Sequence, residues 1–288
     1  MTLEELQERM LGEIPAMPRR LTDGARYVLD NPDDVVIFSM RDLAARAGVS
    51  PATLVRLSRY LGFANWSDIR TIHAAHLRSM PAAYARKASA VLAREGENDL
   101  LAEAFNSHLA NLEHTASVNS AENFHAAAEC LARADRVFIS AFMSCRGPGH
   151  TFAYLCRMLR DNVFLLGSEA TSLVTELSTL RSNDVVLSIN FQPYSREINH
   201  IAHTVERSGA SLICLSDSRG TPLTPHADTV LLFSPESPSF FPSITAANAL
   251  VESLIVALLA HLGDEASERI ARIEQELYAS GTYNHLNG

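Results

Sequence analysis

The sequence predicts a two-domain protein that joins an all-α domain to a three-layer α/β/α sandwich with a five-stranded parallel sheet. Three observations lead to this fold class. The chain has 288 residues, which is enough for two domains of ordinary size. Its first 80 residues show only short helical patterns with capping residues. From Arg136 onward, short β-rich runs alternate with helical runs, which is typical of right-handed βαβ crossovers and a parallel sheet.

Capping residues place the helices of the first 80 residues. Thr22 is a candidate N-cap for a helix that stops at Asn31-Pro32. Ser39 can cap the next helix, with Asp42 three residues later in a capping-box position. Ser50 then precedes Pro51, and the helix that they open ends before Gly62. A further helix is expected over residues 65–80.

The rest of the chain divides into a linker and the α/β part. Residues 81–120 read as a helical linker, and residues 121–288 form the second domain. Amphipathic stretches predict helices at about 99–118 and 121–133. The tail from residue 278 is expected to be irregular. The predicted strands are residues 136–140, 162–167, 184–190, 211–217 and 229–234, and the predicted helices between and after them are residues 150–160, 169–180, 196–209 and 243–262.

The charge of the chain is unevenly distributed. The formal net charge is −9, which by itself argues against a nucleic-acid partner. Residues 17–80, however, hold nine arginines and six aspartates, a local balance of +3. The four cysteines have no metal-ligand spacing and are expected to be reduced, in a cytoplasmic protein. No apolar run reaches about 18 residues without a polar interruption, so no membrane span is expected.

The stretch from Ser39 to Phe63 predicts a helix-turn-helix. Ala44 is the small residue where two helices would cross, and Gly48 supplies the turn. Four apolar side chains would face the core: Val49, Leu54, Leu57 and Leu61. The opposite face would carry Ala52, Thr53, Arg56, Arg59 and Tyr60.

Such a face suits duplex DNA. Arginine can contact guanine through two hydrogen bonds, and hydroxyls and helix N-termini can bind phosphate. The alternative is a plain helical hairpin with solvated arginines, and spacing alone leaves the two readings equal; the local charge and the dense capping favour DNA. The predicted DNA contacts are Ser39, Ser50, Ala52, Thr53, Arg56 and Arg59.

This stretch resembles the N-terminal domain of the RpiR family of bacterial transcriptional regulators. The family pattern is met by Gly48-Val49-Ser50, by Thr53 and Arg56, and by Leu61-Gly62-Phe63. The resemblance covers residues 17 to 265 and implies that the α/β part is similar to an SIS (sugar isomerase) domain. Such domains bind a phosphosugar with hydroxyl-bearing loops that follow the first and third strands and lead into helix N-termini.

The resemblance implies two binding loops in this chain. The first is residues 141–149 with Ser144 and Cys145, and the second is residues 190–197 with Ser195 and Arg196. Ser188 and Asn190 are expected as lesser lining residues. Both loops depart from the family pattern, because Ala141 and Met143 replace glycines of the first and residues 193–196 replace the core of the second. The fold is therefore better supported than the ligand: a phosphosugar is expected first, and other small anions such as carboxylates remain open, with Arg146 or Arg196 as partner.

Three weaker signals have plain structural explanations. Cys145 lies near a predicted helix N-terminus, where a lowered pKa would allow a redox switch, but a small buried side chain is the simpler reading. The pairs His73/His76 and His200/His203 have a spacing that could share a metal, but no third ligand is apparent, and no metal is expected. Glu176 is the carboxylate that an isomerase would use, and a helix-surface role is the simpler reading.

The sequence therefore predicts a DNA-binding regulator with no catalytic residues and no cofactor. Its SIS-like domain would sense a small anionic metabolite and form a homodimer or tetramer on double-stranded DNA with an inverted repeat. The alternative is an aldose–ketose sugar-phosphate isomerase with a helical appendage. A third reading is a structural dimer with a vestigial pocket, which the altered loops leave open.

Overall fold

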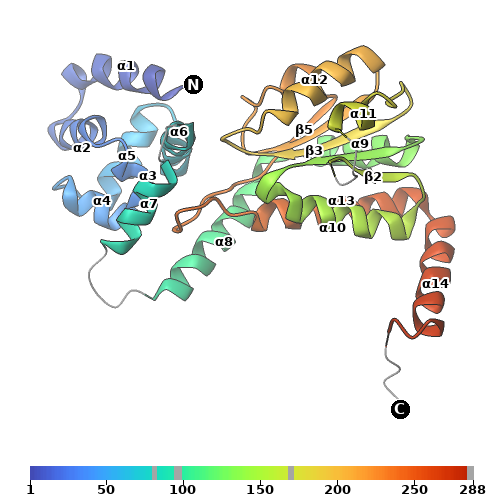
Figure 1. Cartoon of the computed structure of the whole chain (residues 1–288). Coiled ribbons are helices and arrows are strands. Elements are labelled where there is room, and N and C mark those ends of the chain that lie inside the picture. Colours follow the sequence, from blue (N-terminus) through green and yellow to red (C-terminus); the bar gives the residue numbers. More distant parts are fainter. Residues whose placement is uncertain (80–82, 94–98, 168–171, 284–288) are drawn as a thin grey trace. The chain divides into compact units, whose positions relative to one another are not determined.

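The computed structural model describes residues 1–79, 83–93, 99–167 and 172–283 (Figure 1). The chain folds into two units. The first contains residues 1–104 and the short segment 237–241, and the second contains residues 105–236 and 242–288.

The described part of the first unit is helical. Its long helices pack around one apolar core in which Leu6, Met10, Leu54 and Leu57 are fully buried. Gly24 faces this core, where a Cβ would make an ordinary contact of 3.6 Å with the Leu54 side chain. The elements are α1 (Leu3–Glu13), a 3₁₀ turn (Ile14–Ala16), α2 (Arg19–Asp30), α3 (Asp34–Ile37), α4 (Met40–Arg46), α5 (Pro51–Tyr60), α6 (Trp66–Ser79) and the start of the linker, α7 (Ala83–Leu92).

The predicted caps of this unit are confirmed with one exception. Ser39 and Ser50 cap α4 and α5 as the sequence indicates. The helix expected to begin at Thr22 begins earlier, at Arg19, with Pro18 in the cap position. The Thr22 hydroxyl instead donates to the carbonyl oxygens of Met17 and Pro18, at 3.3 and 3.4 Å, so it bonds back along the chain rather than capping the helix start.

The second unit is built on the predicted five-stranded parallel sheet. The strand order is β2-β1-β3-β4-β5, and every neighbouring pair is parallel. The order reverses between β1 and β3, where chain connections leave to opposite sides. The strands are β1 (Val137–Ala141), β2 (Val163–Leu165), β3 (Val185–Asn190), β4 (Ser211–Ser216) and β5 (Thr229–Leu232).

Helices cover both faces of this sheet, which confirms the three-layer architecture. Figure 1 shows α10 and α13 on one face and α11 and α12 on the other. Gly149 on α10 lies directly on β1, since a Cβ at this position would come within 2.4 Å of the Ala141 Cβ. The helices of the unit are α8 (Leu100–Val118), α9 (Ala121–Arg133), α10 (Arg146–Leu159), α11 (Leu173–Leu177), α12 (Glu197–Ser208), α13 (Thr245–Leu262) and α14 (Asp264–Ala279).

Polar side chains of α8 cover the outer edge of β5. Asn119, just after the helix, both donates to and accepts from the backbone of Leu232, at 2.7 and 2.8 Å. The Thr115 hydroxyl accepts from Ser234 N at 3.0 Å, and Asn111 donates to Glu236 O at 2.7 Å. One face of a helix thus replaces the strand that would otherwise pair with this edge, which protects the sheet from pairing with another chain.

Two helices lie at the C-terminal end of the described chain. The first, α13, confirms the helix expected over residues 243–262. In the part of the chain that the structure describes, only α13 is long and apolar enough to cross a membrane, by length and composition alone. It packs against α9 and α10, as the core helix of a domain does. Helix α14, which follows Gly263, was not expected from the sequence. Its buried residue is Ala266, and Ile270, Ile273 and Leu277 on the same side of the helix are half-buried.

Candidate DNA-reading helix and ligand pocket

The two helices α4 and α5 have the geometry that the sequence predicts for a helix-turn-helix. Gly48 between them has a φ of +65°, and nothing lies within 4 Å of the place where a Cβ would be. The turn thus needs glycine for its backbone conformation and not for space. Ala44 is buried where the helices cross. At the start of α5 the Ser50 hydroxyl accepts from Thr53 N at 3.3 Å, which fixes the first turn.

One face of α5 is open to solvent. Ala52, Arg56 and Arg59 are exposed, whereas Leu54 and Leu57 on the opposite face are fully buried. Among the described residues, no hydrogen bond or ion pair holds the Arg56 or Arg59 side chain, so both guanidinium groups can reach a partner. The Thr53 hydroxyl lies 3.0 Å from that of Ser50 and is half-buried, as expected of a group near the helix start.

Other arginines of this unit stabilise the fold. The Arg46 guanidinium lies 3.7 Å from the centre of the Phe38 ring, a cation–π contact. Arg70 donates to Val36 O at 2.9 Å. The count of nine arginines in residues 17–80 therefore overstates the positive charge that is available to DNA.

His73 is a core residue of α6. Its Nδ1 donates to Ile69 O at 2.9 Å, and burial lowers the pKa of the imidazole. The side chain is only 2% exposed and is therefore held neutral at pH 7. Within the described ranges, no group of three or more His, Cys, Asp or Glu side chains could hold a metal ion.

The two predicted loops lie at the point where the strand order reverses. The first follows β1 and the second follows β3, so both stand at the carboxyl edge of the sheet, where sheets of this kind bind ligands. The first loop leads into α10 and the second into α12, and neither helix has a side-chain cap. Not every N–H group of the two first turns is available to an anion. Arg146 N donates within the preceding turn, Pro148 has no N–H, and Asn199 N donates to Arg196 O at 3.2 Å.

The first loop places Ser144 in a one-turn 3₁₀ helix (Met143–Cys145) ahead of α10. Ser144 is half-buried, and Met143 has a φ of +54°. The family has a glycine at this position, and the positive φ gives the physical reason for it. The methionine side chain is 79% exposed and points away from the core. Met143 thus keeps the backbone conformation of the family's glycine, although its side chain is bulky.

The second loop places Ser195 and Arg196 just before α12. Ser195 is half-buried and Arg196, the N-cap residue, is exposed. Ser188 and Asn190, predicted as lesser lining residues, lie deeper, at 0% and 5% exposure. Asn190 donates to the Ser188 hydroxyl at 3.4 Å, so this pair supports the loop from below.

A carboxylate that the sequence reading missed joins these loops. Asp217 directly follows β4, is only 9% exposed, and accepts from the Tyr194 hydroxyl at 3.2 Å and from Gln192 N at 3.4 Å. Thr221 and Ser216 complete the network by donating to Asn190 Oδ1, each at 3.0 Å. The missed signal was the position of Asp217: an ionisable residue at the carboxyl end of a buried parallel strand.

Cys145 does not have the chemistry of a redox switch. Burial, and then the negative charge of Asp217, raises the pKa of its thiol to about 12. The side chain is 4% exposed. The lowered pKa that a switch would need is contradicted, because desolvation of the thiolate outweighs the helix N-terminus. The small buried side chain is the reading that the structure supports.

Two charged residues beside the pocket have structural partners. Arg146 donates to the carbonyl oxygens of Leu166 and Gly167, at 2.8 and 2.7 Å, and so ties α10 to the end of β2. Glu176 accepts from Gly167 N at 2.6 Å. Its Oε2 atom thus holds the chain after β2.

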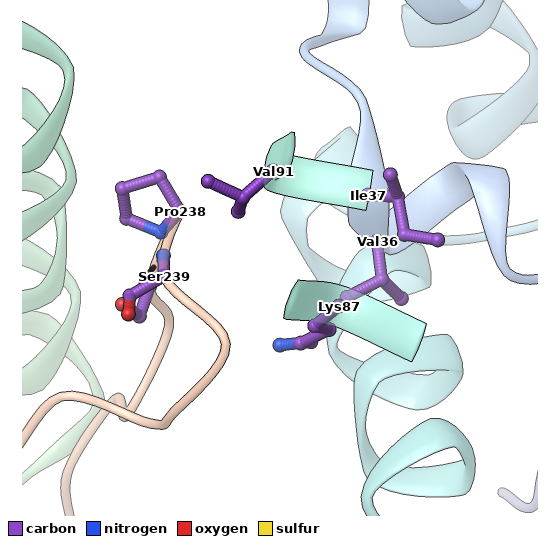
Figure 2. Close-up of a pocket in the computed structure, with 7 residues that line it drawn as sticks. Val36, Ile37, Lys87, Val91, Pro238 and Ser239 are labelled. Atoms are coloured by element: carbon purple, nitrogen blue, oxygen red, sulfur yellow. Dashed lines mark hydrogen bonds between the residues drawn. The ribbon is translucent and has the colours of Figure 1, made fainter. Parts of the chain in front are cut away.

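Two hollows elsewhere in the described residues are poor candidates for an anion. Figure 2 shows one in the first unit, lined by residues of α3 and α7 and by Pro238 and Ser239, whose volume of about 10 Å³ holds about one water. A hollow of about 580 Å³ lies at the amino edge of the sheet. Its one arginine, Arg133, pairs with Glu129 at 2.5 Å, and Asp135 and Asp184 add negative charge.

Comparison with known proteins identifies both units. Residues 5–79 match the model of the helix-turn-helix domain of the rpiR family, and residues 130–257 match that of the SIS domain. The chain belongs to the RpiR family of transcriptional regulators. An uncharacterized HTH-type transcriptional regulator of Caldanaerobacter subterraneus is 28% identical over 219 residues, 75% of each chain. YfhH of Escherichia coli, also an HTH-type regulator, is 24% identical over 255 residues, 87% of this chain and 90% of that one.

Two solved structures show the same fold. NanR of Vibrio vulnificus, solved with ManNAc-6P, has a TM-score of 0.58 and 21% identity, over 95% of this chain and 98% of that one. The sugar isomerase domain of an RpiR transcription factor from Sphaerobacter thermophilus also has a TM-score of 0.58 and 21% identity, over 62% and 99%. At these identities the likeness establishes the fold of this RpiR-family chain and leaves its ligand to the site itself.

Proposed function

We propose that this RpiR-family regulator binds a phosphorylated sugar at the carboxyl edge of its SIS domain. The observation that carries the proposal is the pair of uncapped helix N-termini, α10 and α12, each preceded by a half-buried serine at the reversal of the strand order. Ser144 and Ser195 would donate to the phosphate, and Arg196 would supply charge. ManNAc-6P in the structure of NanR supports this ligand class.

We also propose that the domain has no catalytic role. Glu176, the carboxylate that an isomerase reading needs, is tied to Gly167 N at 2.6 Å. Because the chain carries a helix-turn-helix unit, a bound ligand can act by changing DNA binding, without being converted into a product. The site of action is the cytoplasm, where bacterial DNA is found.

The proposed DNA contacts come from the exposed face of α5. Arg56 would read a base and Arg59, closer to the helix end, would bind phosphate, with Ser39, Ser50, Ala52 and Thr53 completing the contact. A single head makes few phosphate contacts, so two copies of the chain would bind an inverted repeat. Light scattering together with footprinting tests this: a stable monomer that protects one half-site contradicts it.

A route from the pocket to the linker runs through unit 2. Phe191, in the second loop, lies edge-on to Phe233, with ring centroids 6.4 Å apart. Ser234, the next residue, donates to Asn111 Oδ1 on α8 at 2.8 Å. Helix α8 is part of the linker (residues 81–120). We therefore propose that ligand occupancy of the second loop changes DNA affinity through this helix.

The test of the ligand site is the pair of substitutions Ser144→Ala and Ser195→Ala in one chain. A gel shift measures DNA affinity with and without each member of a panel of sugar phosphates. We expect unchanged DNA affinity without ligand and loss of the response to the effector, because each hydroxyl contributes about 1–3 kcal/mol to a charged oxygen. An unchanged response at the original effector concentration would place the ligand elsewhere.

A further inference from the structure

The carboxylate of Asp217 is unexpected in a pocket for an anion. The N-termini of α10 and α12 give the carboxyl edge of the sheet a positive electrostatic potential. Asp217 nevertheless stands at the end of β4 with a formal negative charge and a 9% exposed side chain. A like charge in a partly desolvated site repels an anion strongly, because the local dielectric constant is low.

Three loops meet at this residue. Tyr194 and Gln192 of the second loop donate to it, at 3.2 and 3.4 Å. The first loop is close enough for the Asp217 charge to act on Cys145. These contacts adjoin the proposed phosphate ligands in sequence, because Tyr194 precedes Ser195 and Cys145 follows Ser144. Asp217 therefore lies beside the proposed site, at the same edge of the sheet.

A carboxylate has a definite use in such a place. It accepts hydrogen bonds from hydroxyl or amine groups, but it has no hydrogen-bond donor for an anion. A phosphorylated sugar presents both kinds of group, with hydroxyls a few ångströms from the phosphate, whereas inorganic phosphate presents only the anion. Discrimination between ligands commonly combines an attractive contact for one with repulsion of the other.

We propose that Asp217 is a specificity-determining residue, which accepts hydrogen bonds from the sugar hydroxyls of the ligand and rejects inorganic phosphate by charge repulsion. The inference rests on the proposed function, since it concerns the same pocket. It adds the chemical requirement that the effector carry hydrogen-bond donors next to its phosphate. Simple phosphate, at whatever concentration the cell holds, would then not act as an effector.

The test is Asp217→Asn, which keeps the shape and removes the charge. Binding of inorganic phosphate and of a panel of hexose 6-phosphates is measured by calorimetry on the full chain. We expect the best hexose 6-phosphate to bind about tenfold more weakly and inorganic phosphate to bind severalfold more tightly. The two affinities should change in opposite directions. A residue that only positions the loops would, on substitution, weaken the binding of both ligands.

Two further variants serve as controls. Glu252→Gln removes the same charge at an exposed position of α13 and should change neither affinity. Tyr194→Phe removes one donor to Asp217 and keeps the carboxylate, so rejection of inorganic phosphate should persist. If Asp217→Asn does not fold, competition on the wild-type protein decides: inorganic phosphate that displaces a bound hexose 6-phosphate at equal concentration overturns the inference.

The outcomes separate the inference from the proposed function. If no hexose 6-phosphate binds the wild-type protein, both are overturned. If a hexose 6-phosphate binds and Asp217→Asn weakens it and inorganic phosphate alike, or changes neither, the pocket stands and only the role of Asp217 is refuted.

Discussion

Arg56→Ala is expected to remove a base contact without weakening the fold. The side chain is exposed on α5, and no described residue holds it, so the free energy of unfolding should change by at most about 0.5 kcal/mol. Loss of a two-hydrogen-bond contact to guanine costs about 1–3 kcal/mol for one half-site, roughly 5- to 150-fold in affinity. On an inverted repeat the cost applies twice.

The assay begins with selection of tight-binding duplexes from a random pool by the wild-type protein. Fluorescence anisotropy then gives the affinity of each variant for the selected site and for its single-base changes. Arg56→Ala should lose preference at one base position and keep it at the others. Arg59→Ala should weaken all sequences alike and lower the salt dependence by about one ion, since it contacts phosphate.

Arg46→Ala is the matched control for the loss of an arginine. Its guanidinium lies on the Phe38 ring, at 3.7 Å, so its loss should lower stability by about 0.5–1 kcal/mol and leave base preference intact. If the Arg56→Ala protein selects the same sequence with the same preference at every base position, Arg56 does not contact a base.

The remaining predictions concern stability. Asn119→Ala should lower the free energy of unfolding, measured in urea, by about 1–3 kcal/mol, because Leu232 loses partners for both its N–H and its carbonyl. Asn106→Ala, at an exposed position of α8, which ends just before Asn119, should change it by less than about 0.5 kcal/mol. Gly149→Ala should lower the free energy of unfolding by about 1–3 kcal/mol, since the new Cβ would lie 2.4 Å from the Ala141 Cβ. Gly12→Ala in α1 should raise it by roughly 0.5–1 kcal/mol, because nothing lies within 4 Å of the new Cβ and alanine favours the helix. Equal effects of the two glycine substitutions on the melting temperature would contradict the close approach of α10 to β1.

The sequence by itself determined the features that local physical chemistry controls. Ser50, Pro51 and Gly62 mark the ends of α5 because caps, proline and glycine act within one turn of the chain. Alternating β-rich and helical runs determined the parallel sheet, because only crossovers of helical length can join parallel strands. Ser144 and Ser195 could be placed at one edge for the same reason.

Only the tertiary structure decided which residues meet across the sheet. The order of the strands set Asp217, after β4, beside loops that follow β1 and β3, and no local pattern encodes that proximity. It also separated two exposed arginines of one helical pair: Arg46 is held on the Phe38 ring, whereas no described residue holds Arg56. A side chain's partners depend on contacts between distant segments, and these exist only once the chain has packed.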